Sequence, residues 1–406
     1  MGCSVYTYRI TPQISAQVER IERLRTRIDR QGPISRIWVG RTRRDLEAEA
    51  TAASVRLEGI TVTADEARRI LVGDRPSSVG ETDAAEVLGY RDAMELLLSR
   101  AGDPGFAWQR ELLLAIHRCV LGGSFAAEAG RIRSIQNWLT NSQTGEQAYL
   151  PPEAEAAPAL IDELCVWLTT TDEPAPVAAA LVHVRLAGIH PFRDGNGRTA
   201  RIVASLAMYR GGFRAPQFTS LEEWWGRHVE EYYAAFACLG DAFDSDHDVT
   251  EFVAAHVSAQ AVQAEALSLR NGAERALWVV LEDIAVHDLH LQERATHALY
   301  DALFGRELTN RYYRGIADVS DVTAMQDLRR LVAAGLIEPR GGGRTTHYIG
   351  ADRLIETVAH EAGIDVGRLP AADYCDRSNA LIAALASRIQ GDEVREDSVP
   401  YCARKT

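Results

Sequence analysis

A twelve-residue stretch, 190–201, gathers side chains that could handle a polyphosphate; it reads His-Pro-Phe-Arg-Asp-Gly-Asn-Gly-Arg-Thr-Ala-Arg. His190 is its only side chain with an ordinary pKa near neutrality, so it suits a general base. Asp194 supplies the kind of oxygen ligand that Mg²⁺ prefers. Arg198 and Arg201 are three residues apart, so both extend toward the same end of a helix, and guanidinium groups bind phosphates in bidentate fashion. The stretch predicts a triphosphate site.

The turn within this stretch is suited to a close approach of backbone to an anion. Gly195, Asn196 and Gly197 precede an apolar run, 202–208, that indicates a helix. Glycine lets backbone N–H groups come near a phosphate, and the dipole at the start of a helix favours negative charge. We expect these three residues to contact the transferred phosphate, and Phe192 to anchor the loop in the core.

The stretch resembles the signature of the Fic (filamentation induced by cyclic AMP) family, His-Pro-Phe-x-Asp/Glu-Gly-Asn-Gly-Arg-x-x-Arg, with every specified position matched. The resemblance implies a protein adenylyltransferase that moves AMP from ATP to a Ser, Thr or Tyr hydroxyl of a target protein, with Mg²⁺ as cofactor. It also implies that Arg201 contacts the γ-phosphate. Removal of AMP from a target is an open alternative. Neither the target nor the base preference follows from the residues, although Tyr232 and Tyr233 are candidates for contacting the base.

A second pattern lies upstream, where a predicted helix over about 42–59 ends in Ser-Val-Arg-Leu-Glu-Gly. Ser54 and Glu58 are four residues apart and share a helix face, and Gly59 is the usual residue for a left-handed helix end. This ending resembles the inhibitory motif Ser/Thr-x-x-x-Glu-Gly/Asn of Fic proteins, whose glutamate pairs with the last arginine of the signature, here Arg201. The resemblance implies an autoinhibited enzyme, in which Glu58 pairs with Arg201 and so prevents Arg201 from binding the γ-phosphate.

Residues 131–152 interrupt the helical pattern with two short extended pieces around a polar tip, 140–147. This pattern is typical of a β-hairpin or an exposed loop. Arg-Ser-Ile-Gln-Asn-Trp at 133–138 and Tyr-Leu-Pro-Pro at 149–152 resemble the flap of Fic proteins. In that family the flap aligns a segment of the target by strand pairing.

Helices must position these groups, and apolar periodicity predicts them along most of the chain. The helix over 177–189 delivers His190 at its end, whereas His183 within it is expected to be a core residue. The predicted helices of the catalytic part cover 84–99, 108–121, 158–169, 177–189, 221–239 and 250–269. The expected fold is therefore mostly α, a Fic-type helical domain with one small β-hairpin flap.

Beyond residue 270 the order of elements changes. A short helix over 308–316, a second over 321–334, and two strands around three glycines follow one another. This order is that of a winged helix-turn-helix, a module often joined to Fic domains. The expected organisation is an N-terminal helical region at 1–80, the catalytic domain at 81–269, the winged-helix domain at 270–350 and a C-terminal helical tail at 351–406.

The charge of this module bears on an alternative function, a DNA-binding regulator whose Fic portion senses nucleotide. The chain of 406 residues has a net charge of −13, so no general attraction to nucleic acid is expected. Residues 293–350 contain eight Arg against seven Asp and Glu, a weak footprint for DNA binding. Four arginines are nevertheless candidates for touching phosphates: Arg329, Arg330, Arg340 and Arg344. Winged helices also mediate protein contacts, so target docking and a homodimer stay open.

The cysteines and the distribution of apolar residues indicate the cell compartment of the protein. Six cysteines are scattered without close pairing, which favours reduced thiols and no zinc site. No apolar run reaches the length of a membrane span. We therefore expect a cytoplasmic protein that makes no membrane contact.

Overall fold

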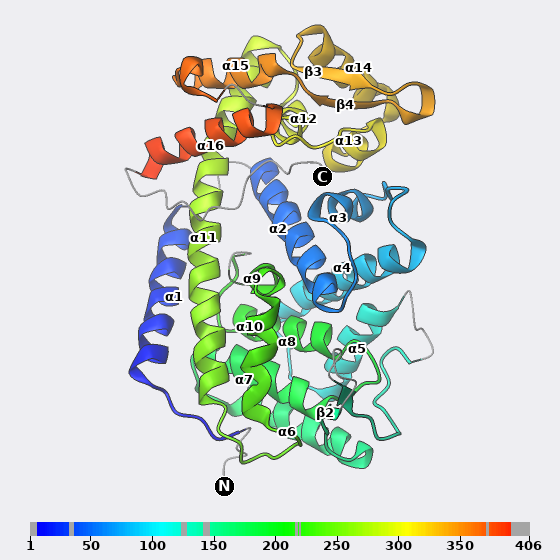
Figure 1. The fold of residues 1–406 in the computed structure, drawn as a ribbon, viewed down its shortest axis with the longest axis vertical. Coiled ribbons are helices and arrows are strands. Elements are labelled where there is room, and N and C mark those ends of the chain that lie inside the picture. Colours follow the sequence, from blue (N-terminus) through cyan, green and yellow to red (C-terminus); the bar gives the residue numbers. More distant parts are fainter. Residues whose placement is uncertain are drawn as a thin grey trace. The chain divides into compact units, whose positions relative to one another are not determined.

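The computed structural model describes residues 6–31, 36–122, 128–140, 147–215, 218, 221–370 and 373–390. This part of the chain is mostly helical and contains two small antiparallel sheets of two strands each (Figure 1). It divides into two compact units. The first comprises Met1–Gly32, Arg43–Leu71 and Arg75–Ala266, and the second comprises Pro33–Thr42, Val72–Asp74 and Leu267–Thr406.

The first unit holds the predicted catalytic residues within a helical core. Its elements are α1 (Pro12–Gln31), α2 (Arg36–Leu57), α3 (Ala64–Leu71), α4 (Glu81–Ala101), α5 (Arg110–Leu121), β1 (Leu139–Thr140), β2 (Gln147–Tyr149), α6 (Ala157–Thr170), α7 (Ala175–Ile189), α8 (Asn196–Arg210), α9 (Leu221–Arg227), α10 (Val229–Ala235) and the first part of α11 (Thr250–Asp283). Almost every residue of α7 is buried, because this helix is apolar on all sides. Helix α8 packs along it, so the loop between them is fixed at both ends.

The mostly helical prediction is confirmed, with two differences in the extent of helices. The predicted helix over 221–239 is divided at His228, whose imidazole stacks on Trp224 and whose Nδ1 lies 2.9 Å from the Trp224 carbonyl oxygen. A side chain that bonds a helix carbonyl competes with the backbone ladder. Helix α11 continues to Asp283, so no linker marks the predicted domain boundary near 270.

The second unit has its own apolar core, which includes Trp278, Tyr300 and Tyr313. Its further elements are α12 (Thr296–Leu303), α13 (Asn310–Ala317), α14 (Asp321–Ala333), β3 (Ile337–Arg340), β4 (His347–Gly350), α15 (Asp352–Glu361) and α16 (Tyr374–Gln390). The side chains of Thr309 and Ser320 cap α13 and α14 by accepting backbone N–H bonds. The predicted order of helix, turn, helix and hairpin is thus present.

Two of the four arginines that are candidates for touching phosphates have partners within the second unit. Arg330 donates to the Leu289 carbonyl at 2.7 Å, and Arg340 pairs with Glu338. The side chain of Arg344 and the tail from residue 391 lie outside the described residues. Charge counts do not show which arginines have partners in the folded unit.

The cysteines differ in one place from the expectation of six reduced thiols. Cys119, Cys165 and Cys238 are free, whereas Cys375 is disulfide-bonded. Spacing along a chain does not show which cysteines become neighbours in space, which is why this bond was not expected. Among the described helices, none is long and apolar enough to cross a membrane.

Candidate active site

His190 closes α7 in a left-handed conformation, with φ of 48°. Its Nδ1 lies 3.3 Å from the carbonyl oxygen of Ala187, and because a carbonyl only accepts, Nδ1 carries the proton. The lone pair is then on Nε2. Burial lowers the pKa of His190 to about 4, against weaker raising effects of the Ala187 bond and the Glu58 charge. At neutral pH the imidazole is uncharged and able to accept a proton.

The loop from Pro191 to Gly195 is closed by the side chain of Asn196. Its Oδ1 accepts from the Phe192 N–H, and its Nδ2 donates to the Phe192 carbonyl, both at 2.9 Å. These two bonds use one N–H and one oxygen lone pair of the amide, which leaves its second N–H for the predicted contact with a phosphate. Asn196 shapes the loop, and the backbone N–H groups at the start of α8 are what faces an anion.

His117 on α5 supports the same loop and was not anticipated from the sequence. Its ring stacks on Phe192, with 3.7 Å between centroids and 4° between planes. The Gly130 N–H donates to His117 Nδ1 at 3.0 Å, so His117 Nε2 carries a proton and donates to the Asp194 carbonyl at 2.9 Å. Phe192 is 1% exposed, as an anchor of the loop must be.

Asp194 and Arg198 form the outer edge of the loop. The Asp194 carboxylate accepts from the Gly195 N–H at 2.6 Å and is about half exposed, whereas Arg198 is buried. Arg198 Nη2 lies 3.7 Å from Asp194 Oδ1, and its Nη1 pairs with Glu86 of α4. Burial lowers the pKa of Arg198, and the Glu58 charge opposes that effect.

Arg201 is buried and holds the end of α2. Its Nη2 donates to Glu58 Oε1 at 2.9 Å and to the Ser54 carbonyl at 3.0 Å. Its Nε donates to the Ser54 hydroxyl at 3.2 Å. Burial opposes the charge of Arg201, yet Tyr232 and the Glu58 carboxylate raise its pKa above the usual value. The structure thus brings both residues of the upstream pattern to the last arginine of the signature.

Two glycines permit this arrangement. Gly195 has a φ of 72°, in the left-handed region that favours glycine. At Gly197, a Cβ atom would lie only 2.5 Å from Glu58 Oε1 and 3.1 Å from Arg201 Nη1. Glu58 can reach Arg201 only because position 197 has no side chain. Gly59, just after Glu58, has a φ of 87°, as expected for the residue that ends this helix.

A chain of buried hydrogen bonds leads from Arg201 to Tyr232, His183 and His256 and orients the guanidinium. Arg201 Nη1 donates to the Tyr232 hydroxyl at 3.0 Å, and that hydroxyl lies 3.3 Å from His183 Nε2. His183 Nδ1 lies 3.2 Å from His256 Nε2. Burial lowers the pKa of both histidines, that of His256 to about 3, so both are neutral.

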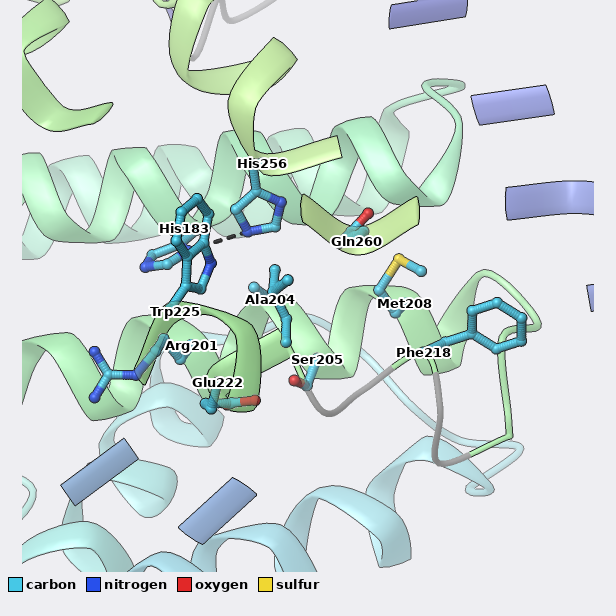
Figure 2. Close-up of a pocket in the computed structure, with 11 residues that line it drawn as sticks. His183, Arg201, Ala204, Ser205, Met208, Phe218, Glu222, Trp225, His256 and Gln260 are labelled. Atoms are coloured by element: carbon cyan, nitrogen blue, oxygen red, sulfur yellow. Dashed lines mark hydrogen bonds between the residues drawn. The ribbon is translucent and has the colours of Figure 1, made fainter. Parts of the chain in front are cut away.

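This chain borders a small pocket of the first unit (Figure 2). Figure 2 shows His256 and Gln260 on α11 facing Ser205 and Glu222 across it. His183 is a core residue, as expected. Tyr232 is buried against Arg201 and cannot stack on a base, whereas Tyr233 is 56% exposed and donates to the Leu57 carbonyl at 2.7 Å.

The predicted flap is present as the antiparallel pair β1 and β2, in which Leu139 faces Tyr149. Its tip, 141–146, lies outside the described residues. Arg133 joins the base of the flap to the site, since its Nε donates to the His190 carbonyl at 2.9 Å and its Nη2 to the Pro152 carbonyl. The flap and the histidine are therefore held by one side chain.

Comparison with known proteins identifies residues 107–208 as a match to the Fic/DOC family. Protein adenylyltransferase Fic of Nematostella vectensis is 33% identical over 162 residues, which cover 39% of this chain and 36% of the relative. Protein adenylyltransferase fic-1 of Caenorhabditis elegans is 33% identical over 201 residues, covering 46% and 36%. The chain thus spans 36% of the length of each of these relatives.

Solved structures agree with this match. A Fic family protein from Desulfovibrio desulfuricans G20 has a TM-score of 0.55 at 22% identity, covering 85% of this chain and 98% of that protein. A fragment of Fic-1 from Caenorhabditis elegans has a TM-score of 0.51 at 27% identity, covering 64% and 71%. The Desulfovibrio protein shares the fold.

Proposed function

We propose, starting from the Fic/DOC family domain that this chain contains, that the protein is an adenylyltransferase. It transfers AMP from ATP to a hydroxyl of a target protein. The observation that carries this proposal is the placement of a neutral imidazole, His190, directly before the N-terminus of α8, where Arg198 and Arg201 are also rooted. A base and two phosphate-binding cations thus share one helix start.

The geometry suits in-line displacement at the α-phosphorus. A target hydroxyl oxygen forms a bond to this phosphorus while its proton passes to His190 Nε2, and the bond from the α-phosphorus to the bridging oxygen breaks. Pyrophosphate leaves with the electron pair of that bond. Backbone N–H groups at the start of α8 stabilise the charge on the transferred phosphate, and Arg198 and Arg201 stabilise the charge on the leaving group.

Asp194 fits a magnesium ion that arrives with the nucleotide. It offers one half-exposed carboxylate, and Mg²⁺ is commonly held by one or two carboxylates together with phosphate oxygens. Within the described residues, no group of three or more His, Cys, Asp or Glu forms a metal cluster. When bound, the ion would neutralise phosphate charge. Asp194 is the residue that would hold it.

We further propose that the enzyme is autoinhibited by Glu58. Its carboxylate accepts a hydrogen bond from Arg201 Nη2, the donor that a γ-phosphate would need. The carboxylate would also repel that phosphate directly. Because Glu58 follows the last residue of α2 and its side chain is 25% exposed, it can withdraw without unfolding the core. Removal of AMP by the same site is a second direction of the same chemistry.

Helices α13 and α14 with the hairpin of β3 and β4 are proposed to form a winged helix-turn-helix. Its surface does not favour the DNA-binding alternative, because Arg330 and Arg340 have partners within the unit. Asp327 does not contribute to the charge of this surface, since it is buried and bonded to Arg294 and Tyr313. We therefore propose no DNA-binding role for this module.

The test uses α-labelled ATP with Mg²⁺ and four proteins: wild type, Glu58→Gly, Glu58→Gly with His190→Ala, and Glu361→Gly as a control at the end of another helix. We expect Glu58→Gly alone to label itself or lysate proteins, with a mass gain of one AMP. Labelling that survives loss of His190, or a gain of phosphate instead of AMP, would overturn the proposal.

A further inference from the structure

Each of the two signature arginines pairs with a carboxylate from a different helix. Arg201 holds Glu58 at the end of α2, whereas Arg198 holds Glu86 in the middle of α4. The Glu58 side chain is 25% exposed and the Glu86 side chain only 5%. The two carboxylates therefore differ in their freedom to move, which points to different roles.

Glu86 has no route out of its position. Helix α4 packs against both α5 and α8. One turn beyond Glu86, a Cβ at Gly89 would lie 2.6 Å from the Val120 carbonyl oxygen of α5, so the two helix backbones touch. A residue inside such a helix cannot withdraw as Glu58 can. Arg198 thus keeps its carboxylate whether or not Glu58 is in place.

The ion pair with Glu86 leaves the Nη2 group of Arg198 directed toward the proposed active site. Arg198 Nη1 forms an ion pair with Glu86 Oε2, while Nη2 lies 3.7 Å from Asp194 Oδ1. A guanidinium is a rigid planar fork, so fixing one terminal nitrogen fixes the direction of the other. Glu86 also compensates the cost of burying the Arg198 charge.

We infer that Glu86 is a positioning residue of the transfer reaction: it aims Arg198 at Asp194 and the phosphates of ATP, in the inhibited and the active state alike. This inference rests on the adenylyltransferase function proposed above. The inference assigns different roles to the two arginines. Arg198 is neutralised before the nucleotide binds, and Arg201 alone exchanges a carboxylate for a phosphate.

The experiment introduces Glu86→Gln, which keeps the side-chain shape, into Glu58→Gly protein. Glu223→Gln is the matched control, because Glu223 is also buried and pairs with an arginine, Arg227, away from the signature. KM and kcat for ATP are measured, together with the Kd for Mg-ATP in a His190→Ala version that does not turn over. Melting temperatures of all variants report folding.

We expect Glu86→Gln to raise KM and Kd for ATP about ten-fold, the effect of weakening one charge-assisted contact, while Glu223→Gln changes neither. In an Arg198→Ala background, Glu86→Gln should have no further effect on Kd, because Glu86 acts through Arg198. If Glu86→Gln does not fold, Glu86→Asp, which retains the charge, should give an intermediate Kd.

Three results would overturn the inference. The first is an unchanged Kd for Glu86→Gln. The second is higher activity for Glu86→Gln with Glu58 intact, which would make Glu86 a second inhibitory residue. The third is an equal loss in the Arg198→Ala background. Should Glu58→Gly transfer no AMP at all, the proposed function fails, and the Kd comparison still tests Glu86 separately.

Discussion

Glu58 Oε1 lies 2.9 Å from Arg201 Nη2, at the place where the end of α2 meets the first turns of α8. The contact joins residues 143 positions apart in the chain. It is one of several bonds that Arg201 makes to the same helix, since Ser54 accepts two more through its hydroxyl. The proposed inhibitory arrangement therefore combines one charged contact that can break with neutral contacts that hold the arginine in place.

The affinity for ATP should increase in steps as this charged contact is weakened. We expect Glu58→Gln to bind Mg-ATP more tightly than wild type, and Glu58→Gly more tightly still. A hydrogen bond to a charged group contributes about 1.5–3 kcal/mol, or roughly ten- to a hundred-fold in affinity. Isothermal titration calorimetry checks the order, with Glu361→Gly as the control. Equal affinities for all variants would contradict the role of Glu58.

Tyr232→Phe should destabilise the fold and weaken ATP binding together. The change leaves Arg201 Nη1 and His183 Nε2 without their shared hydroxyl in a buried site. An unsatisfied buried polar group costs about 1–3 kcal/mol. Urea unfolding measures the loss of stability. Tyr233→Phe is the control, since Tyr233 is 56% exposed and its hydroxyl donates to the Leu57 carbonyl. An equally large loss of stability for Tyr233→Phe would contradict the role of Tyr232.

His190 should titrate far below an ordinary histidine, because burial lowers its pKa to about 4. Nitrogen-15 NMR of labelled histidine should show a neutral ring with the proton on Nδ1. Since the Glu58 charge raises this pKa, Glu58→Gly should lower it further. Between the ordinary value and the lowered one, the unfolded chain binds a proton that the folded chain does not, so the free energy of unfolding decreases as the pH falls. A pKa near 6.5 would contradict the site described here.

Asp194→Asn should raise the Mg²⁺ concentration needed for half-maximal AMP transfer in Glu58→Gly protein, without loss of stability. The carboxylate is about half exposed, and its bond to the Gly195 N–H can be kept by an amide oxygen. Magnesium titrations of activity and of Mg-ATP binding measure the shift, with melting curves beside them. An unchanged magnesium requirement would mean that another group holds the ion.

The sequence predicted those parts of the site that lie close together along the chain. His190, Asp194, Arg198 and Arg201 are held in one loop and one helix turn, so local spacing determines their arrangement. Glu58 was found through a short motif at a helix end. Helix periodicity likewise predicted most helices, since burial of one face is a local pattern.

Glu86 and His117 could not be predicted, although both contact the signature loop. Each is a single polar residue in an otherwise ordinary helix, and its partner is far away in the sequence. Glu86 contacts Arg198, and His117 contacts Asp194, which is 77 residues away. Only the packing of α4 and α5 against α8 creates these contacts. The bonds from the Asn196 side chain to Phe192 could not be predicted for a related reason, because closure of a loop depends on its path in space.

The backbone conformation of His190, the proposed base, destabilises the fold. Its φ of 48° lies in a region that disfavours a side chain by about 1–2 kcal/mol. A His190→Gly protein should therefore melt at a higher temperature than His190→Ala, the reverse of the order for these two residues inside a helix, while both are expected to be inert. Selection for stability alone would replace this histidine with glycine. An enzyme that keeps His190 for activity would therefore have a lower melting temperature than it could otherwise reach.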